Sequence, residues 1–339
     1  MNDSIWAPYL IFLGDEQDSR IAKTGSGLFY WAKDRCLAQI RLPGAKADIG
    51  LPDMSINEAV KAGARTLVLG VAPAAGQVPK SWLPTIELAL RSGMDIVSGM
   101  HADLEQIESI RGLAERAGRR LIDIRKAPEG LPVGNGVKRK GMRLITVGTD
   151  CGVGKMYAAL AIHRELQQAG ADADFRATGQ TGMLIAGDGI CIDAVVADFM
   201  AGAAELLSPD NTANHWDIIE GQGSLHHPAY AGVSLALLHG SQPDVIVMCH
   251  DASRELMVGL KGRPVPSIEA SIELNLQCAR IVNSSVRVGG VCANTSAMSE
   301  SDANDWMTDT QRKLQVPVCD PVRTGVSSIV KEINELCAA

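Results

Sequence analysis

The stretch Arg143-Leu-Ile-Thr-Val-Gly-Thr-Asp-Cys-Gly-Val-Gly-Lys155-Met156 decides the fold of the second half of this chain. An apolar strand, residues 143–147, leads into spaced glycines, and an alanine-rich helical stretch, residues 157–168, follows. In such a setting the N–H groups at a helix start hold phosphate oxygens, and the lysine adds positive charge. The stretch predicts a phosphate-binding loop made of Gly148, Thr149, Asp150, Cys151, Gly152, Val153, Gly154, Lys155 and Met156.

The residue after the lysine is unusual for such a loop. In the common form a serine or threonine stands there and places its hydroxyl on Mg²⁺. Here the position holds Met156, and a thioether is a poor ligand for so hard a cation. The sequence therefore predicts a loop that binds a polyphosphate without the usual means of activating one.

The composition is that of a globular protein with room for two domains: 339 residues, 46% of them hydrophobic and 21% charged. A formal net charge of −7 argues against nucleic acid or an anionic membrane as a partner. The N-terminus does not resemble a signal peptide, and no apolar run approaches the roughly 18 residues of a membrane span. The eight cysteines include no Cys-x-x-Cys pair, so we expect no zinc or redox site and a reducing, cytoplasmic setting.

Short apolar strands alternate with helical stretches through the first third of the chain, which favours a parallel sheet covered by helices. The expected strands are residues 9–13, 38–42, 66–71, 95–97 and 120–124, and the expected helices are 56–62, 84–91 and 104–117. No Gly-x-Gly-x-x-Gly fingerprint is present, so we expect a Rossmann-like domain, residues 1–130, without a bound dinucleotide. A segment rich in proline, glycine and charge, residues 131–141, is interpreted as a linker.

The same alternation continues through residues 142–339. The expected strands are residues 143–147, 173–177, 216–219, 245–249, 286–292 and 316–319, and the expected helices are 157–168, 194–207, 233–239, 268–279, 303–314 and 326–336. The chain is thus predicted to be an α/β protein, with a Rossmann-like domain followed by a doubly wound P-loop NTPase-like domain. The ligand of the second domain should lie across the carboxyl ends of its strands.

Three candidate site residues directly follow predicted strands of the second domain. Glu220 begins Glu220-Gly-Gln-Gly, where a carboxylate can reach a metal, a water or an amine near the phosphates, or simply cap its own turn. Asn294 offers a donor and an acceptor to the edge of an adenine, although asparagine is also a common turn former. Arg323 follows the last strand and could clamp a carboxylate in bidentate fashion or form a surface ion pair.

Two further segments carry candidate polar groups. Residues 174–182 are dense in polar side chains and glycines, and a small polar substrate could bind there through Arg176, Gln180 and Thr181. His227, in the pair His226-His227, could act as a general base. A zinc site is not expected from this pair, because no third ligand stands at a suitable spacing.

The second domain resembles the dethiobiotin synthetase branch of P-loop proteins. That branch shows Gly-Thr-Asp-Thr-x-Val-Gly-Lys-Thr, then Glu-Gly-x-Gly, then Gly-Val-x-x-Asn. Here these motifs stand in the same order, as residues 148–156, 220–223 and 290–294. Cys151 and Met156 replace the second and third threonines of its loop motif, and the replacement at Met156 removes the magnesium ligand.

Almost the whole chain resembles the DgcN family, long catalogued as a domain of unknown function. The similarity lies in residues 9–15, 39–44, 50–53, 148–155, 176–182, 220–224 and 320–325. A residue without a hydroxyl after the loop lysine is usual in that family. Met156 is therefore typical of the family and is not a defect of this chain.

The resemblance to the DgcN family implies a D-glutamate N-acetyltransferase, in which acetyl-CoA donates its acetyl group to the amine. A dipeptide-epimerase-like partner enzyme would then convert the product to its L form. Acetyl transfer needs a free amine, a base and donors for the tetrahedral oxyanion. We hypothesise Glu220 as the base, His227 as the second choice, and Lys155 or the loop N–H groups as stabilisers of the diphosphate or the oxyanion. Arg176 and Arg323 would hold the two carboxylates of the substrate.

Two other functions stay open at this point. One is an ATP- and Mg²⁺-dependent ligase or kinase of the dethiobiotin synthetase type, with the metal held by Glu220 and an aspartate. The other is a nucleotide-sensing protein without catalysis. For the acetyltransferase we expect small-molecule substrates, no required metal, no nucleic-acid or membrane partner, and a homo-oligomer.

Overall fold

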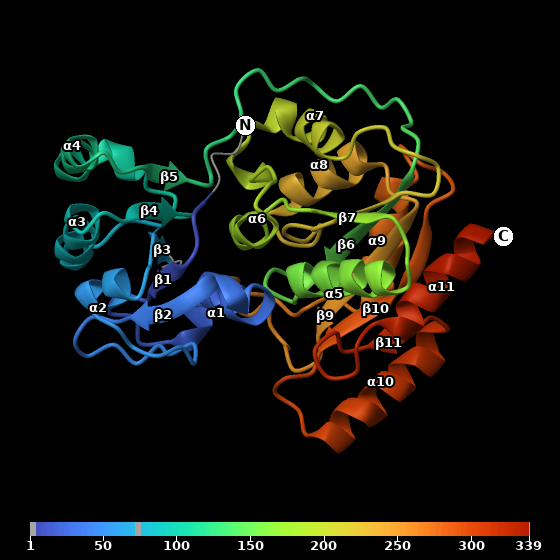
Figure 1. Ribbon diagram of the computed structural model, residues 1–339. Helices are drawn as coiled ribbons and strands as arrows, with labels where there is room; N and C mark the ends of the chain where they lie inside the picture. Colours follow the sequence, from blue (N-terminus) through green and yellow to red (C-terminus); the bar gives the residue numbers. More distant parts are fainter. Residues whose placement is uncertain (1–4, 72–75, 339) are drawn as a thin grey trace. The chain divides into compact units, whose positions relative to one another are not determined.

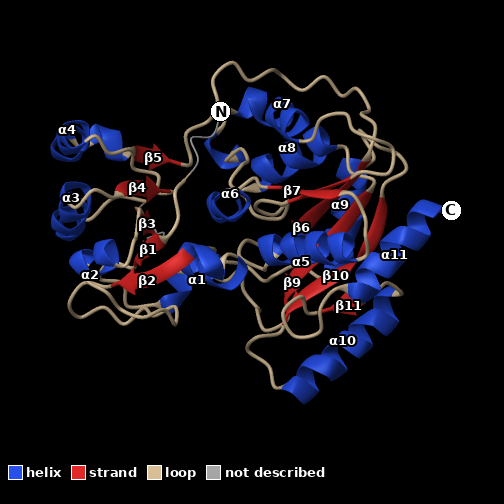
Figure 2. Cartoon of the chain, viewed as in Figure 1, coloured by secondary structure: helices blue, strands red, loops and turns tan. Residues whose placement is uncertain are grey.

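The computed structural model describes residues 5–71 and 76–338, and the chain divides into two compact units. Unit 1 holds the chain up to Lys126 together with the segment Gln180–Cys191. Unit 2 holds Ala127–Gly179 and the chain from Ile192 onward. In each unit parallel strands lie between helices (Figures 1 and 2), which confirms the predicted α/β class.

Unit 1 is built on a parallel sheet of five strands in the order β2-β1-β3-β4-β5. Strands β1 and β3 are wholly buried because helices cover both faces of the sheet. Helices α2, α3 and α4 lie on one side of the strands in Figure 1, and α1 lies on the other. The strands are β1 Tyr9–Phe12, β2 Cys36–Ile40, β3 Thr66–Leu69, β4 Asp95–Ser98 and β5 Leu121–Asp123, and the helices are α1 Lys23–Trp31, α2 Ile56–Lys61, α3 Leu83–Arg91 and α4 Glu108–Ala117.

Unit 2 is built on a parallel sheet of six strands in the order β11-β10-β9-β6-β8-β7. Helices α5 and α11 pack together on one face, and α7, α8 and α9 follow one another on the opposite face. The strands are β6 Met142–Gly148, β7 Ala173–Arg176, β8 Trp216–Ile219, β9 Val245–Asp251, β10 Arg287–Asn294 and β11 Val318–Cys319. The helices are α5 Lys155–Gln168, α7 Ala197–Leu207, α8 Ala231–Ser241, α9 Ile268–Ala279, α10 Glu300–Leu314 and α11 Ser327–Ala338. Within the described residues, none of the helices has the length and apolar character needed to cross a membrane.

The short helix α6, Gln180–Ala186, leaves unit 2 and completes unit 1. Leu184 buries its side chain in the core of unit 1. Arg35 donates from Nη1 to the carbonyl oxygens of Leu184 and Ile185, at 3.1 and 3.4 Å. The expected division assigned every residue after 141 to the second domain, whereas the structure groups residues 180–191 with the N-terminal sheet.

The expected linker, residues 131–141, contains no helix and is fastened to unit 2. The buried carboxylate of Glu205 accepts hydrogen bonds from the N–H groups of Asn135 and Gly136. The fully buried guanidinium of Arg143 donates to the carbonyl oxygens of Arg139 and Lys140. These contacts hold the segment against the unit that carries the phosphate loop.

Candidate active site

The phosphate loop joins strand β6 to the first turn of α5, as predicted. Gly154 is the N-cap residue of α5 with φ of 100°, so no side chain there satisfies the first N–H groups of the helix. Gly152 also lies in the left-handed region, with φ of 63°. Successive N–H groups in loops of this kind form a concave anion-binding surface.

Lys155 folds back across the loop and is almost fully buried. Its Nζ donates to the carbonyl oxygen of Asp150 at 2.9 Å. Burial lowers the pKa of this ammonium below its ordinary value. Gly148 provides the space that it needs, because a Cβ there would lie 2.9 Å from Nζ. The amine of Lys155 therefore lies at the base of the loop.

The carboxylate of Asp150 is fully buried beneath the loop and is held by three donors. The N–H groups of Cys151 and Val258 donate to it at 2.7 and 2.8 Å, and Nη1 of Arg254 lies 3.2 Å from Oδ2. Arg254 also donates to the carbonyl oxygens of Cys151 and Gly152, at 2.5 and 3.1 Å. Arg254 was not predicted from the sequence, because it lies 104 residues from Asp150 in a segment without a recognisable motif.

The side chain of Thr149 contacts a histidine that was not predicted from the sequence either. Its Oγ1 lies 3.0 Å from Nδ1 of His250, whose ring stacks on Trp306 with centroids 5.8 Å apart. Burial lowers the pKa of His250, which favours the neutral ring. His250 lies near the end of β9, and this position at the carboxyl edge was the signal that could have found it.

Glu220 directly follows β8, and its buried carboxylate is held by two backbone N–H groups. Those of Thr178 and Gly179 both donate to Oε2 at 3.1 Å. Burial raises the pKa of the carboxyl to about 7, while the two hydrogen bonds and the positive charge of Lys155 oppose the rise. Near neutral pH the group is therefore divided between its acid and base forms, which suits a general acid–base role.

The turn after Glu220 is pressed against the strand of the phosphate loop. A Cβ at Gly221 would lie 1.6 Å from the carbonyl oxygen of Thr146, so no other residue fits. The N–H of Gly221 donates to Oγ1 of Thr146 at 3.0 Å, and the hydroxyl of Ser224 donates to the carbonyl oxygen of Thr149 at 3.1 Å. The glycine thus brings the carboxylate segment and the loop together.

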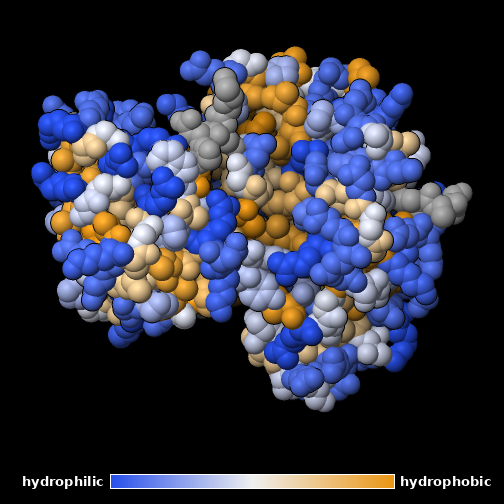
Figure 3. Space-filling view, in the orientation of Figure 1, coloured by the Kyte–Doolittle hydropathy of each residue, from blue (hydrophilic) through white to orange (hydrophobic). Residues whose placement is uncertain are grey.

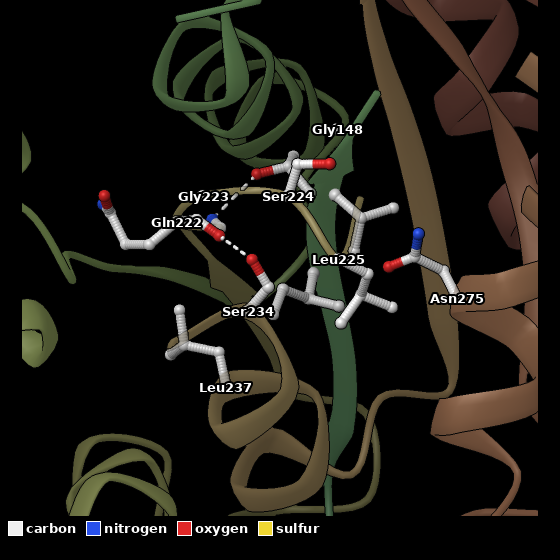
Figure 4. Close-up of a pocket in the computed structure, with 12 residues that line it drawn as sticks. Gly148, Gln222, Gly223, Ser224, Leu225, Ser234, Leu237 and Asn275 are labelled. Atoms are coloured by element: carbon white, nitrogen blue, oxygen red, sulfur yellow. Dashed lines mark hydrogen bonds between the residues drawn. The ribbon is translucent and has the colours of Figure 1, made fainter. Parts of the chain in front are cut away.

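A small cavity lies between this turn, strand β6 and helices α8 and α9 (Figure 4). Its volume is about 10 Å³, which is near the space of a single water molecule. Figure 4 shows Ser234 pointing toward the carbonyl of Gln222, to which its hydroxyl donates at 2.7 Å. The cavity is too small for a substrate and belongs to the packing beneath the loop.

His227, the second candidate base, already has hydrogen-bond partners at both ring nitrogens. Nε2 lies 3.0 Å from the carbonyl oxygen of Val258, and Nδ1 accepts from the N–H of Ala229 at 3.3 Å. Because a carbonyl oxygen only accepts, Nε2 carries the proton and Nδ1 does not. This geometry favours Glu220 over His227 as the base.

Asn294 is the last residue of β10, and Arg323 lies in the loop that follows β11. Oδ1 of Asn294 accepts from the N–H of Ser296 at 3.1 Å, so the asparagine does shape its own turn. The exposed Arg323 donates from Nη2 to the carbonyl oxygens of Thr295 and Met298, at 3.2 and 2.7 Å. Nη2 of Arg323 therefore bridges two carbonyl oxygens of the loop that follows β10.

The two arginines expected to hold one substrate lie at opposite edges of the sheet. Arg176 ends β7, while Arg323 follows β11, five strand spacings away. At about 4.8 Å per spacing this separates their strands by roughly 24 Å. Arg176 also pairs with Asp217 at 2.6 Å and with Asp174 at 2.9 Å. The structure therefore contradicts a joint clamp on the two carboxylates of one glutamate.

Gln180 and Thr181 begin α6 and belong to unit 1. A Cβ at Gly99 would lie 1.8 Å from Oε1 of Gln180, so this side chain lies directly against the glycine. The hydroxyl of Thr181 donates to that of Thr24 at 3.2 Å. Of the four residues expected to bind substrate, Arg176 and Arg323 thus belong to unit 2, and Gln180 and Thr181 belong to unit 1.

Two groups of side chains in the described residues have the donor types of a metal site. Within each group the donor atoms lie within 4.8 Å of one another; the groups are Asp150, Cys151 and His227, and Asp174, His215 and Asp217. An arginine already pairs with the carboxylates of each group, Arg254 in the first and Arg176 in the second. A guanidinium at the donor atoms disfavours a metal cation there.

Comparison with known protein families agrees with this architecture. Residues 132–330 match the P-loop domain of DUF1611, a family described as a domain of unknown function. Residues 41–127 match the N-terminal, Rossmann-like domain of the same family. The two predicted domain types are thereby confirmed.

Individual relatives match over nearly the full length. A D-glutamate N-acetyltransferase from a Pseudoalteromonas species is 48% identical over 326 residues, which is 96% of this chain and 98% of that protein. A D-glutamate N-acetyltransferase from Tritonibacter scottomollicae is 45% identical over 326 residues with the same coverage. The crystal structure of a DUF1611 family protein from Anabaena variabilis matches with a TM-score of 0.88 at 30% identity, and covers 97% of this chain and 99% of that one. The predicted resemblance of nearly the whole chain to D-glutamate N-acetyltransferases is confirmed.

Proposed function

The chain belongs to the DUF1611 family, and we propose that it is a D-glutamate N-acetyltransferase that uses acetyl-CoA as the acetyl donor. The two relatives named for this activity support the proposal. The observation that carries it is a phosphate loop without a magnesium-binding hydroxyl, beside Glu220, a buried carboxyl with a pKa of about 7. Coenzyme A offers a diphosphate to such a loop, and acetyl transfer breaks no bond at phosphorus. Acetyl transfer therefore does not need the magnesium-binding hydroxyl that Met156 lacks, and we propose that no metal is required.

Glu220 serves as the general base in this proposal. The ammonium of D-glutamate loses a proton to the carboxylate, and the free amine attacks the acetyl carbonyl carbon. As the C–S bond of the tetrahedral intermediate breaks, the departing thiolate of coenzyme A takes up the proton held by Glu220. The second nitrogen proton then passes to the regenerated carboxylate, which releases it to solvent. A base whose pKa lies near the working pH is the most effective for such transfers.

The phosphate loop serves as the anion-binding element. Its N–H groups and Lys155 hold the diphosphate or stabilise the oxyanion of the tetrahedral intermediate, where fixed donors in a buried site act strongly. We propose that Asn294, at the end of β10, contacts the adenine through its amide. His227 is kept only as an alternative base, because both of its ring nitrogens have partners.

Thiol release tests the proposal directly. The purified protein is mixed with acetyl-CoA and D-glutamate, and free thiol is followed with a colorimetric reagent. We expect turnover with D-glutamate and much less with L-glutamate. Formation of ADP from ATP and Mg²⁺ would instead support the ligase or kinase, and nucleotide binding without any turnover would support the sensing protein.

Two variants separate the candidate bases. Replacement of Glu220 by glutamine should lower kcat about 100-fold or more, the scale of general base catalysis. Replacement of His227 by glutamine should leave kcat within about tenfold of wild type on the same scale. Full turnover by the Glu220 variant, with an unaltered pH profile, would exclude this residue as the base.

We propose that the protein acts in the cytoplasm. A cytoplasmic location is consistent with the absence of disulfides among the cysteines in the described part of the chain. A dipeptide-epimerase-like enzyme would consume the acetylated product. We also propose a homo-oligomer, because apolar residues gather on the surface of unit 2 where Figure 1 shows α7 and α8 (Figure 3). Those exposed side chains are Val196, Phe199, Leu206 and Leu235.

A further inference from the structure

We propose that Arg254 is a positioning residue that sets the phosphate-binding face of the loop. It does so by holding two carbonyl oxygens of the loop away from the ligand. The inference rests on the proposed function in one respect, because it takes the diphosphate of coenzyme A as the ligand. Its physical basis is the set of contacts that the guanidinium makes.

Both terminal nitrogens of Arg254 are fully engaged with the protein. Nη1 donates to Oδ2 of Asp150 at 3.2 Å and to the carbonyl oxygen of Cys151 at 2.5 Å. Nη2 donates to the carbonyl oxygen of Gly152 at 3.1 Å and to Oδ2 of Asp251 at 3.2 Å. Each terminal nitrogen has two N–H bonds. The terminal nitrogens therefore donate four hydrogen bonds within the protein, and none of their N–H groups is left for a ligand. We call this set of four hydrogen bonds the clamp.

The clamp fixes the direction of the loop N–H groups. A peptide bond is planar and trans, so the C=O of one residue and the N–H of the next point in opposite directions. Holding the carbonyls of Cys151 and Gly152 toward Arg254 therefore turns the N–H groups of Gly152 and Val153 away from it. The positive φ of Gly152 allows the backbone to adopt this arrangement of carbonyl and N–H groups. Two donors are thus aimed in advance at the anion.

The geometry indicates that Arg254 orients the loop through the arrangement of its N–H groups and not through its positive charge. Its positive charge is offset by two carboxylates, Asp150 and Asp251, which lie 3.2 Å from its terminal nitrogens. A lysine in its place would keep the charge but could not present two nitrogens to two carbonyls. The lysine variant therefore distinguishes a clamp from a simple counterion.

The test measures coenzyme A binding by calorimetry for Arg254→Lys, Arg254→Ala and a control, Arg312→Ala. Arg312 lies on the exposed surface and pairs only with Asp309 among the salt bridges of the described residues. We expect both Arg254 variants to bind coenzyme A about tenfold more weakly or worse, the scale of a lost charge-assisted hydrogen bond. Added guanidinium ion should restore binding to the alanine variant, because it can refill the vacated position. The control should match wild type.

Backbone amide order parameters from NMR relaxation give a readout that does not depend on the ligand or on turnover. In the free protein the N–H vectors of Gly152 and Val153 should have lower order parameters in Arg254→Lys than in wild type, because two carbonyl oxygens of the loop are no longer held. Unchanged order parameters, or coenzyme A binding by Arg254→Lys at wild-type strength, would overturn the clamp. A wild-type protein that binds coenzyme A but acetylates nothing would refute the proposed function and leave the clamp standing.

Discussion

Replacing Glu220 by glutamine should make the protein more stable at alkaline pH while it removes the proposed base. In the folded chain burial raises the pKa of this carboxyl from 4.5 to about 7. Each tenfold change in an acid dissociation constant is worth about 1.4 kcal/mol, so ionising the group at pH 8 costs the folded state about 3 kcal/mol. A glutamine cannot ionise and therefore avoids this cost.

The sign of the effect follows from the two pKa values. Below pH 4.5 the carboxyl is protonated in both the folded and the unfolded chain, and the wild type keeps its full stability. Between 4.5 and about 7 only the unfolded chain releases the proton, so the free energy of unfolding falls as the pH rises through this window. Above about 7 both states are ionised and the loss is complete.

Thermal unfolding of wild type and Glu220→Gln between about pH 5 and about pH 8 measures this difference. About 2.5 kcal/mol of the loss falls in that range, so the melting temperature of the variant should gain on wild type by about 5–10 °C, for a unit of roughly 150–250 residues. Glu300→Gln, on the exposed first turn of α10, controls for the loss of one negative charge. Parallel pH curves for wild type and Glu220→Gln would refute the reasoning, because they would mean that this carboxyl does not resist ionisation.

Three further predictions follow from the site. Gly221→Ala should abolish activity and destabilise unit 2, since its Cβ would meet the carbonyl oxygen of Thr146 at 1.6 Å, while Gly232→Ala on α8, with open space around it, should keep wild-type activity and melting temperature. Asn294→Ala should raise KM for acetyl-CoA but not for an acetyl thioester of pantetheine, which has no adenine; an equal rise for both donors would argue against the adenine contact. Removal of divalent cations with EDTA should leave thiol release unchanged, because Met156 offers no hydroxyl to a magnesium ion.

The sheets and the phosphate loop could be predicted because their signals are local. Strands buried on both faces are short apolar runs, as residues 9–12 and 66–69 illustrate. Helix α1 was missed because glycines interrupt its helical pattern, and one of them packs closely against the sheet. The N–H of Gly25 donates to the carbonyl of Gly70 at 2.9 Å, and this packing is a tertiary property.

The site could be predicted only as far as each residue follows a strand. Glu220 was found from that position alone, but the N–H groups that hold its carboxylate come from the end of a neighbouring strand. Arg254 offered no local signal, since its partners are the carbonyl oxygens of a distant loop. Arg176 was assigned to substrate because the sequence does not show that Asp174 and Asp217 lie beside it on the sheet.

The placement of α6 means that neither unit is a continuous piece of the chain. The backbone passes between the units three times, after Lys126, after Gly179 and after Cys191. A truncation at the linker would remove Leu184 from the core of the N-terminal unit. We therefore expect that neither half of the chain folds on its own as it does in the full protein. Gly179, which donates to Glu220, is joined by a single peptide bond to the first residue of α6. One of the two N–H groups that hold the carboxylate of the proposed base therefore belongs to the last residue before the chain passes into unit 1.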